Sequence, residues 1–292
     1  MKTIVCSISG GRTSAYMAYK LKNNLSDLED FMGDSVELKY VFANTGMEHD
    51  DTLRFLSDVD EQFNLGVVWV EGVAQHGERV STKHRIVDCN TASRNTEWKN
   101  DKHPFHGHIM KYGIPNIAFP TCTREMKLNS ITSYLRSIGL NKSDYYTAIG
   151  IREDEKRRVS KNADAGNIFY PLVDIWPTDK QDVLDFFSEF DWDLKIPEWQ
   201  GNCVTCFKKS YKKLKAVYFE TPNVFDFTDY MEKKYPRVGA EFRNEWSPDR
   251  VFFRKSMSTE KLIESFDDND PHPYIDDGGC SESCEMYQME LI

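Results

Sequence analysis

The sequence predicts an α/β fold with a doubly wound, mostly parallel sheet and a smaller, Cys-containing subdomain toward the C-terminus. Two observations lead to this fold class. Short apolar runs typical of buried strands alternate with longer segments whose apolar residues recur at helical spacing. Polar, glycine-containing segments directly follow the first two apolar runs, and ligands of such sheets bind at the carboxyl ends of the strands.

Most of the strand and helix signals lie in the first quarter of the chain. Residues 3–8 and 38–43 are apolar runs that we interpret as strands, and residues 13–25 between them have helical spacing. A second helix is expected over 50–63 and a third strand over 67–70. Strands and helices of these lengths pair in parallel through right-handed crossovers, which favours a doubly wound sheet.

The alternation breaks in the middle of the chain, where polar residues, histidines and turn signals dominate. Helical spacing resumes over 124–138, a further strand is expected over 145–150, and a later helix over 180–190. The resulting domain prediction is an α/β domain over 1–198, an inserted and substrate-facing segment within it over 72–120, and a Cys- and Lys-rich subdomain with an acidic tail over 199–292.

Composition limits the class of protein. The chain has 292 residues, of which 40% are hydrophobic, enough for a buried core. No apolar run reaches the length of a membrane span and no signal-peptide pattern precedes the first strand, so we expect a cytoplasmic protein without a membrane partner. The net charge of −10 argues against uniform attraction to nucleic acid but allows a local basic track.

The segment that follows the first strand, residues 9–14, has the sequence Ser-Gly-Gly-Arg-Thr-Ser and precedes a helix. Two glycines let the backbone present its N–H groups closely, and the helix N-terminus favours an anion. Ser9 and Ser14 add hydroxyls and Arg12 adds charge. The spacing fits neither the Walker loop nor the dinucleotide fingerprint. The alternatives are a phosphate-binding loop or a plain strand-to-helix turn capped by Ser9 or Thr13.

Two further polar segments follow predicted strands. The first runs from Asn44 to Glu48, and Glu48 is either a site residue or an acid stabilised at a helix start. The second is a charged run in which Arg152, with Arg157 or Arg158, can bridge phosphate oxygens. Its acidic members, Asp154 or Glu155, would orient these arginines or hold Mg²⁺. The alternative for this run is a solvated surface.

Seven cysteines, odd in number and unevenly spaced, favour thiol or metal chemistry over a disulfide framework. Cys203 and Cys206 lie three positions apart, a spacing that suits a metal or a cluster, and Cys122 is the candidate third ligand. Thiolates do not choose between zinc and iron–sulfur, and three unrelated buried thiols are the remaining interpretation.

Histidines and lysines offer two weaker signals. His103, His106 and His108 have metal-like spacing, but Pro104 and Gly107 argue against a helix, so we expect solvated or substrate-contacting side chains. The segment 208–215 interleaves lysines with apolar residues, which indicates either a solvated helix face or a phosphate track for nucleic acid or a second anionic substrate. Its lysines are Lys208, Lys209, Lys212, Lys213 and Lys215.

In combination, five short motifs resemble a known family. Their order, over roughly residues 3–235, is Ser-Gly-Gly-Arg-Thr-Ser from Ser9, Asn-Thr-Gly-x-Glu from Asn44, Cys-Thr-Arg-Glu-x-Lys from Cys122, Gly-Ile-Arg-x-Asp-Glu from Gly150 and Gly-Asn-Cys-x-x-Cys from Gly201. This set resembles the phosphoadenosine phosphosulfate (PAPS) reductase family of the PP-loop adenine-nucleotide α-hydrolase superfamily, especially its phage-encoded and DNA-sulfur-modification-like branches. The loop departs from the common Ser-Gly-Gly-x-Asp-Ser pattern at Thr13.

The resemblance implies a Rossmann-like fold and a site for an adenine nucleotide, either ATP or PAPS, in the cytoplasm of the host if the gene is phage-borne. It implies catalytic roles for Arg152, Asp154 and Lys127. The implied nucleotide-binding residues are Ser7, Ser9, Gly10, Gly11, Arg12, Thr13, Ser14, Asn44, Thr45, Gly46, Glu48, Gly150, Arg152 and Arg157.

The resemblance also implies an iron–sulfur cluster, with zinc as its rival. Related cluster-bearing enzymes carry a Cys-Cys pair at the earlier site, whereas here Thr121 precedes Cys122. A fourth ligand would come from Cys280, from Cys284 or Cys89, or from no protein group. We take Cys122, Cys203, Cys206 and Cys280 as the expected metal ligands.

Three functions follow from this resemblance. The first is ATP cleavage between the α and β phosphates, with adenylation coupled to iron–sulfur-dependent sulfur transfer from a sulfur or electron donor protein. The second is a sulfonucleotide reductase that releases sulfite, although the usual Glu-Cys-Gly-Leu-His tail is absent. The third is a nucleotide-binding regulatory protein without turnover.

Overall fold

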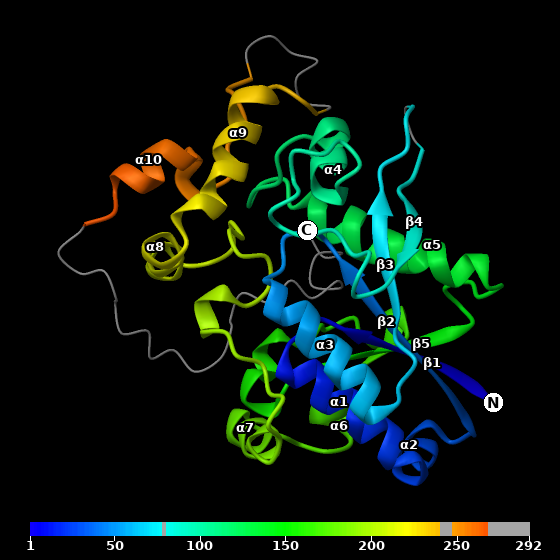
Figure 1. Ribbon diagram of the computed structural model, residues 1–292. Helices are drawn as coiled ribbons and strands as arrows, with labels where there is room; N and C mark the ends of the chain where they lie inside the picture. Colours follow the sequence, from blue (N-terminus) through cyan, green and yellow to red (C-terminus); the bar gives the residue numbers. More distant parts are fainter. Residues whose placement is uncertain (78–79, 240–246, 268–292) are drawn as a thin grey trace.

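A computed structural model describes residues 1–77, 80–239 and 247–267 (Figure 1). Its centre is a six-stranded sheet with the order β4-β3-β2-β1-β5-β6, so the first strand of the chain lies in the middle. All neighbouring pairs are parallel except β3 and β4. The strands are β1 (Lys2–Ile8), β2 (Val36–Asn44), β3 (Val68–Val73), β4 (Lys83–Val87), β5 (Tyr145–Ile149) and β6 (Ile168–Phe169). The predicted α/β class with a mostly parallel sheet is confirmed.

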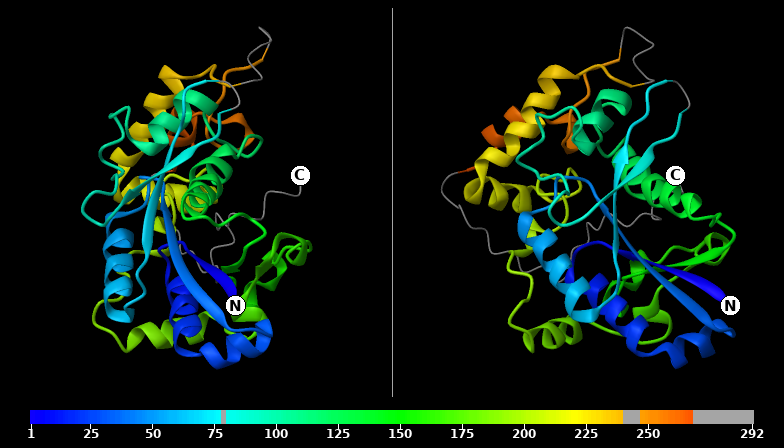
Figure 2. Two further views of the ribbon diagram at one scale, coloured as in Figure 1. Left: turned by 90° about the vertical axis from the view of Figure 1, so that its right-hand side faces the viewer. Right: turned by 45° about the vertical axis from the view of Figure 1, so that its right-hand side comes forward.

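Helices cover both faces of this sheet, as parallel strands require. Figure 2 shows α1 and α3 on one side of the strands and α5 on the other. The α-helices are α1 (Arg12–Asn23), α2 (Leu25–Met32), α3 (Asp50–Phe63), α4 (Pro104–Tyr112), α5 (Asn129–Ser137), α6 (Pro171–Asp174), α7 (Lys180–Ser188), α8 (Tyr211–Glu220), α9 (Asp226–Lys234) and α10 (Thr259–Glu264). Shorter 3-10 helices include η2 (Glu153–Arg158) and η4 (Glu198–Gln200).

The alternation of side chains along β1 divides the core into two layers. Ile4 and Cys6 pack with α1, α3 and α7 in one buried cluster. Val5 points the other way, into a cluster with Ile131 and Leu135 of α5. Because β1 is buried on both faces, its apolar run reads as continuous, which is why this strand is readily predicted.

A third core cluster joins the middle of the chain to the C-terminal part. Trp98, Phe105 and Cys122 pack in it with Val204 and Phe207, together with residues of α8, α9 and α10. Figure 1 shows α4, α8, α9 and α10 gathered on the side of the molecule away from α2 and α7. The segment that carries the paired cysteines is therefore held by its own apolar contacts next to the sheet.

Two helical segments differ from the sequence prediction. The expectation that Pro104 and Gly107 disfavour a helix is wrong, because α4 begins at Pro104, where a missing N–H costs nothing in the first turn. The helix expected over 124–138 starts instead as a π-helix, η1 (Thr123–Leu128), directly after Cys122. Single π-helical turns occur often at functional sites.

Within the described part of the chain, every helix is too short or too polar to cross a bilayer.

Candidate functional site

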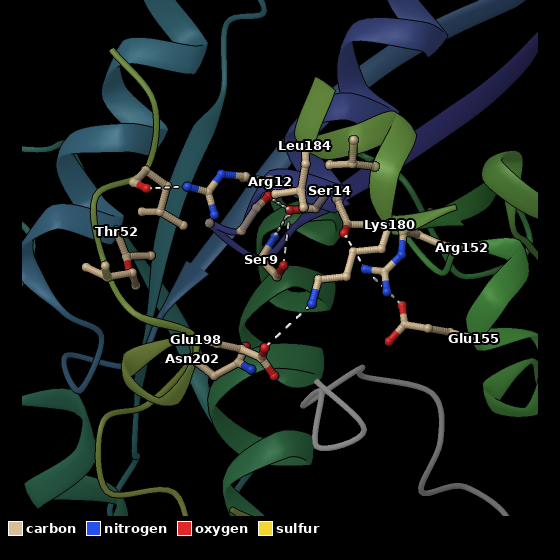
Figure 3. A pocket seen from close by; sticks show the side chains of 18 of the residues that line it. Ser9, Arg12, Ser14, Thr52, Arg152, Glu155, Lys180, Leu184, Glu198 and Asn202 are labelled. Atoms are coloured by element: carbon tan, nitrogen blue, oxygen red, sulfur yellow. Dashed lines mark hydrogen bonds and ion pairs between the residues drawn. The ribbon is translucent and has the colours of Figure 1, made fainter. Parts of the chain in front are cut away.

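A cavity of about 420 Å³ lies beyond the carboxyl ends of β1 and β5, where the predicted loop connects β1 to α1 (Figure 3). It brings together five separate stretches of the chain. The described lining residues are Ser9, Gly10, Gly11, Arg12, Thr13, Ser14, Thr52, Gly150, Arg152, Glu155, Arg158, Lys180, Val183, Leu184, Leu194, Ile196, Pro197, Glu198, Gly201 and Asn202. All six residues of the predicted loop, with Gly150 and Arg152, line this one cavity.

The loop is a tight turn fixed by its own side chains. Gly10 has a φ of +82°, and a Cβ there would lie 2.6 Å from Cγ2 of Thr52, so glycine is required for both conformation and space. The Ser9 N–H donates to Oγ of Ser14 at 3.1 Å, and that hydroxyl donates to the carbonyl of Gly11 at 2.9 Å. Gly11 caps α1 without a side-chain acceptor among the described residues, which leaves the first helical N–H groups available to an anion.

Gly150 sits opposite the loop at the end of β5. A Cβ on Gly150 would lie 3.1 Å from the Cα of Ser14, so the two backbones are in close contact. Ser7, also predicted as a nucleotide-binding residue, lies within β1 between Val41 and Ile149 and is not among the described lining residues.

Arg12 points away from the turn. Its guanidinium forms a bidentate ion pair with Asp193 at 2.7 and 2.8 Å and also donates to the Leu194 carbonyl. The Arg12 side chain therefore anchors the segment at Asp193 and Leu194, which contributes to the cavity wall. Nothing near Arg12 in the sequence signals this partner.

Arg152 occupies the cavity wall and is 6% exposed. It donates to both carboxylate oxygens of Asp154 at 2.9 Å and to Oγ1 of Thr13 at 3.1 Å, and it lies 3.5 Å from Glu155. The hydrogen bonds from Arg152 lower the pKa of Asp154. Thr13 thus contacts an arginine through a neutral hydroxyl, while Asp154 supplies the counter-charge.

From the sequence, either Arg157 or Arg158 could accompany Arg152 as a phosphate ligand. The structure distinguishes between the two. Arg158 lines the cavity and pairs with Glu155 at 2.5 Å. Arg157 is exposed on η2 and is not among the described lining residues. Because η2 completes a turn about every three residues, these neighbouring side chains point in different directions.

One wall of the cavity is apolar and was not predicted. Val183 and Leu184 of α7 line it at a spacing that places them on one helical face with Lys180. Leu194, Ile196 and Pro197 complete this wall. The cavity lining therefore combines N–H groups, hydroxyls and guanidinium groups with an apolar surface that suits a flat, apolar group.

The segment from Asn44 to Glu48 lies deeper than expected. Asn44 donates to buried Glu71 at 2.6 Å, and Glu48 accepts from the Thr45 N–H at 3.0 Å and from the Thr45 hydroxyl. Gly46 packs against His103, whose imidazole would lie 2.4 Å from a Cβ at this position. Asn44, Thr45, Gly46 and Glu48 are all absent from the described lining of the cavity.

This buried network leads to the paired cysteines. Glu48 and Cys203 form an isolated antiparallel bridge, and Oγ1 of Thr45 lies 3.3 Å from Sγ of Cys203. Gly201 and Asn202, which line the cavity, directly precede Cys203. Cys203 therefore follows the cavity-lining residues directly in the chain and contacts the Asn44–Glu48 network.

The expected metal ligands do not form a complete site within the described residues. Over residues 1–77, 80–239 and 247–267, no three His, Cys, Asp or Glu side chains are arranged to hold a metal ion. Cys122 is buried in the third core cluster, at the start of the π-helix that carries half-buried Lys127. Cys280 and Cys284 lie outside the described residues. The described residues alone do not provide the ligand set of a cluster or of zinc.

The three histidines of α4 and its N-cap were expected to be solvated or to contact substrate, but all three are buried and none is among the described residues that line the cavity. His103, His106 and His108 are each at most 2% exposed. His106 contacts the Trp98 carbonyl at 2.8 Å and the Tyr235 hydroxyl at 3.0 Å. Burial lowers the pKa of His103 to about 4 and that of His108 to about 3, so both are neutral near pH 7.

The lysine-rich segment 208–215 divides into two kinds of side chain. Lys209 and Lys213 are buried, the first donating to the carbonyls of Trp199 and Val204 and the second to Glu198 at 3.1 Å. Lys212 is exposed, and Lys208 and Lys215 are partly exposed. Two of the five lysine side chains therefore form hydrogen bonds in the protein interior.

Comparison with known proteins adds a relative and a distant structural likeness. No family model matches the chain. It is 29% identical over 300 residues to an uncharacterized nin region protein, ORF290, of Escherichia phage lambda, which covers 98% of this chain and 96% of the relative. Among solved structures it is similar to the U34-tRNA thiolase NcsA from Methanococcus maripaludis with its [4Fe-4S] cluster, with a TM-score of 0.38, 15% identity, and coverage of 80% of this chain and 68% of that one.

Proposed function

We propose that this chain is a PP-loop enzyme that binds ATP in the cavity, cleaves it between the α and β phosphates and thereby activates an oxygen for replacement by sulfur. The observation that carries the proposal is the mixed polar and apolar lining of the cavity. The polar part of the lining combines the loop with Arg152 and Arg158, and the apolar part comes from α7 and residues 194–197. This combination suits the phosphates and the base of one nucleotide.

The adenylation step can be written for the residues present. An acceptor oxygen attacks the α-phosphorus, a new P–O bond forms, and the bond to the β-phosphate bridging oxygen breaks, so pyrophosphate leaves with the electron pair. Arg152 and Arg158 would stabilise the charge that develops on the leaving group. Both Asp154 oxygens already accept from Arg152, which favours an orienting role for Asp154 over direct binding of Mg²⁺.

The sulfur step is supported by the place of Cys203, next to the cavity-lining Gly201 and Asn202. A hydrosulfide-level donor would attack the activated carbon, a C–S bond would form, and AMP would leave with the former acceptor oxygen. Because the described residues do not complete a cluster site, no part of this step is assigned to a cluster. PAPS reductase-family membership is part of the proposal.

The test is pyrophosphate release from ATP by the anaerobically purified chain with a panel of RNA, DNA and small acceptors. We expect release that depends on the acceptor and falls at least tenfold in Arg152→Met, with Lys156→Met as the matched control because Lys156 is exposed and pairs with neighbouring Glu153. ATP binding with no release across the panel would favour the regulatory protein. Sulfite release from PAPS would favour the reductase.

A further inference from the structure

One cation of the cavity belongs to none of the predicted motifs. Lys180 lies at the start of α7, on the same face as the cavity-lining Val183 and Leu184. Its Nζ lies 3.7 Å from Oε2 of Glu198, and Figure 3 shows the side chain extended toward that carboxylate. Lys180 and Glu198 both line the cavity, so a ligand bound there would lie next to their ion pair.

Glu198 has a second and better protected partner. Its Oε1 accepts from Nζ of Lys213 at 3.1 Å, and the Lys213 side chain is 4% exposed, compared with 42% for Lys180. Departure of Lys180 would therefore leave Glu198 paired with a buried cation. The pair with Lys180 is longer and more exposed, and such ion pairs are weak.

The surroundings of Lys180 favour a polyanion as its alternative partner. The same cavity contains Arg152 and Arg158, together with the hydroxyls and N–H groups of the Ser9–Ser14 loop. A lysine ammonium on a flexible stem is a common phosphate ligand, and charge-assisted hydrogen bonds to phosphate are stronger than an exposed ion pair at this distance.

We propose that Lys180 is a phosphate-binding residue that leaves Glu198 and contacts the terminal phosphates when a nucleoside di- or triphosphate binds. This inference rests on the proposed function, because it assumes that the cavity holds a nucleotide. It also predicts a specificity. Lys180 recognises a chain of phosphates, so it contributes little to the affinity for a nucleoside monophosphate. Glu198 acts as the competing partner that the phosphates displace.

The experiment is isothermal titration of wild type, Lys180→Met and Glu198→Gln with ATP, inorganic triphosphate and AMP at one ionic strength. Lys180→Met should weaken binding of ATP and triphosphate by about tenfold or more and that of AMP by less than about twofold, since a hydrogen bond to a charged group is lost. Glu198→Gln should tighten triphosphate binding, because the competing carboxylate is gone. Lys156→Met is the matched lysine control and should change no affinity.

Each outcome decides a separate question. Wild type that binds neither ATP nor triphosphate would overturn the proposed function itself. Wild type that binds both, with a correctly folded Lys180→Met that binds them equally well, would overturn only the role of Lys180. An equal loss for AMP and triphosphate would also overturn it, because such a loss indicates a disturbed cavity rather than a missing phosphate contact.

Discussion

Arg12 and Asp193 lie 181 residues apart in the sequence and form a bidentate ion pair, with Nε to Oδ1 at 2.7 Å and Nη2 to Oδ2 at 2.8 Å. Arg12 also donates to the Leu194 carbonyl, and Arg54 of α3 donates to the Asp193 carbonyl at 3.1 Å. Arg12 thus connects the apolar wall of the cavity to α1, and Arg54 connects it to α3. The loop and the wall form one unit.

This relationship predicts that Arg12 and Asp193 act together. Arg12→Ala and Asp193→Ala should weaken ATP binding to a similar extent, because each releases the same wall. The double variant should be little worse than either single variant, with a coupling of about 1 kcal/mol, as for residues in direct contact. Titration of the four proteins with ATP and with inorganic triphosphate measures this coupling.

A direct phosphate contact by Arg12 would give a different pattern. Arg12→Ala would then lose triphosphate affinity, while Asp193→Ala would keep it or gain it through the released guanidinium. That result would contradict the structural role of Arg12 and return it to the set of phosphate ligands.

Gly10→Ala should abolish tight nucleotide binding, because its Cβ would meet Cγ2 of Thr52 at 2.6 Å in a backbone with positive φ. We expect at least a tenfold loss of ATP affinity and about 1–3 kcal/mol lower unfolding free energy. Thr52→Ser in the same chain removes the colliding methyl group and should restore part of the affinity.

Gly139 supplies the matched control for Gly10. It has a similar φ of +88°, yet among the described residues no atom beyond its chain neighbours lies within 4 Å of its hypothetical Cβ. Gly139→Ala should therefore cost only the strain of the left-handed backbone, roughly 1 kcal/mol, and leave ATP affinity unchanged. A similar loss of affinity in both variants would mean that global destabilisation, rather than loop geometry, explains the Gly10 result.

The sheet and the loop were predictable because their signals are local. A strand buried on both faces is an apolar run, and Gly10 and Gly11 follow one such run directly. The antiparallel strand β4 was missed because its sequence, Lys-His-Arg-Ile-Val, has mixed polarity at the sheet edge. The helix α4 was missed because a proline signals the start of a helix as well as its interruption.

The rest of the cavity depends on contacts between distant segments. No pattern near Arg12 indicates Asp193, and none near Lys180 indicates Glu198, because tertiary packing brings these residues together. The capped start of α7, where Asp179 accepts from the Asp182 N–H, marks a helix but not its place at the cavity. Likewise, the spacing of lysines in 208–215 does not reveal which of them are buried.

Lys209 is the clearest case of a charge used inside the protein. Its Nζ donates to the carbonyls of Trp199 and Val204, on either side of the cavity-lining Gly201 and Asn202. Lys209→Met should lower the unfolding free energy by about 2–3 kcal/mol, because two carbonyls lose a charged donor. Lys212→Met, on the exposed face, should change it by less than about 0.5 kcal/mol. Urea denaturation of both variants tests this, and equal effects would contradict the assignment.

The buried histidines predict that stability falls on mild acidification. His103 and His108 have pKa values lowered to about 4 and about 3 by burial, whereas an unfolded histidine has a pKa of about 6.5. Between pH 6.5 and pH 4 the unfolded chain therefore binds more protons than the folded one, and the unfolding free energy decreases as pH falls. Each histidine contributes a slope of up to about 1.4 kcal/mol per pH unit in this window.

Urea denaturation at intervals from pH 7 to pH 4.5 measures that slope. His108→Gln keeps a polar partner for Oγ1 of Thr121, which His108 contacts at 3.0 Å, and removes one titrating group, so its slope should be shallower by up to about 1.4 kcal/mol per pH unit. An unchanged slope in His108→Gln would show that His108 is protonated as readily in the folded chain as in the unfolded one, and the acid sensitivity would then have to come from other groups.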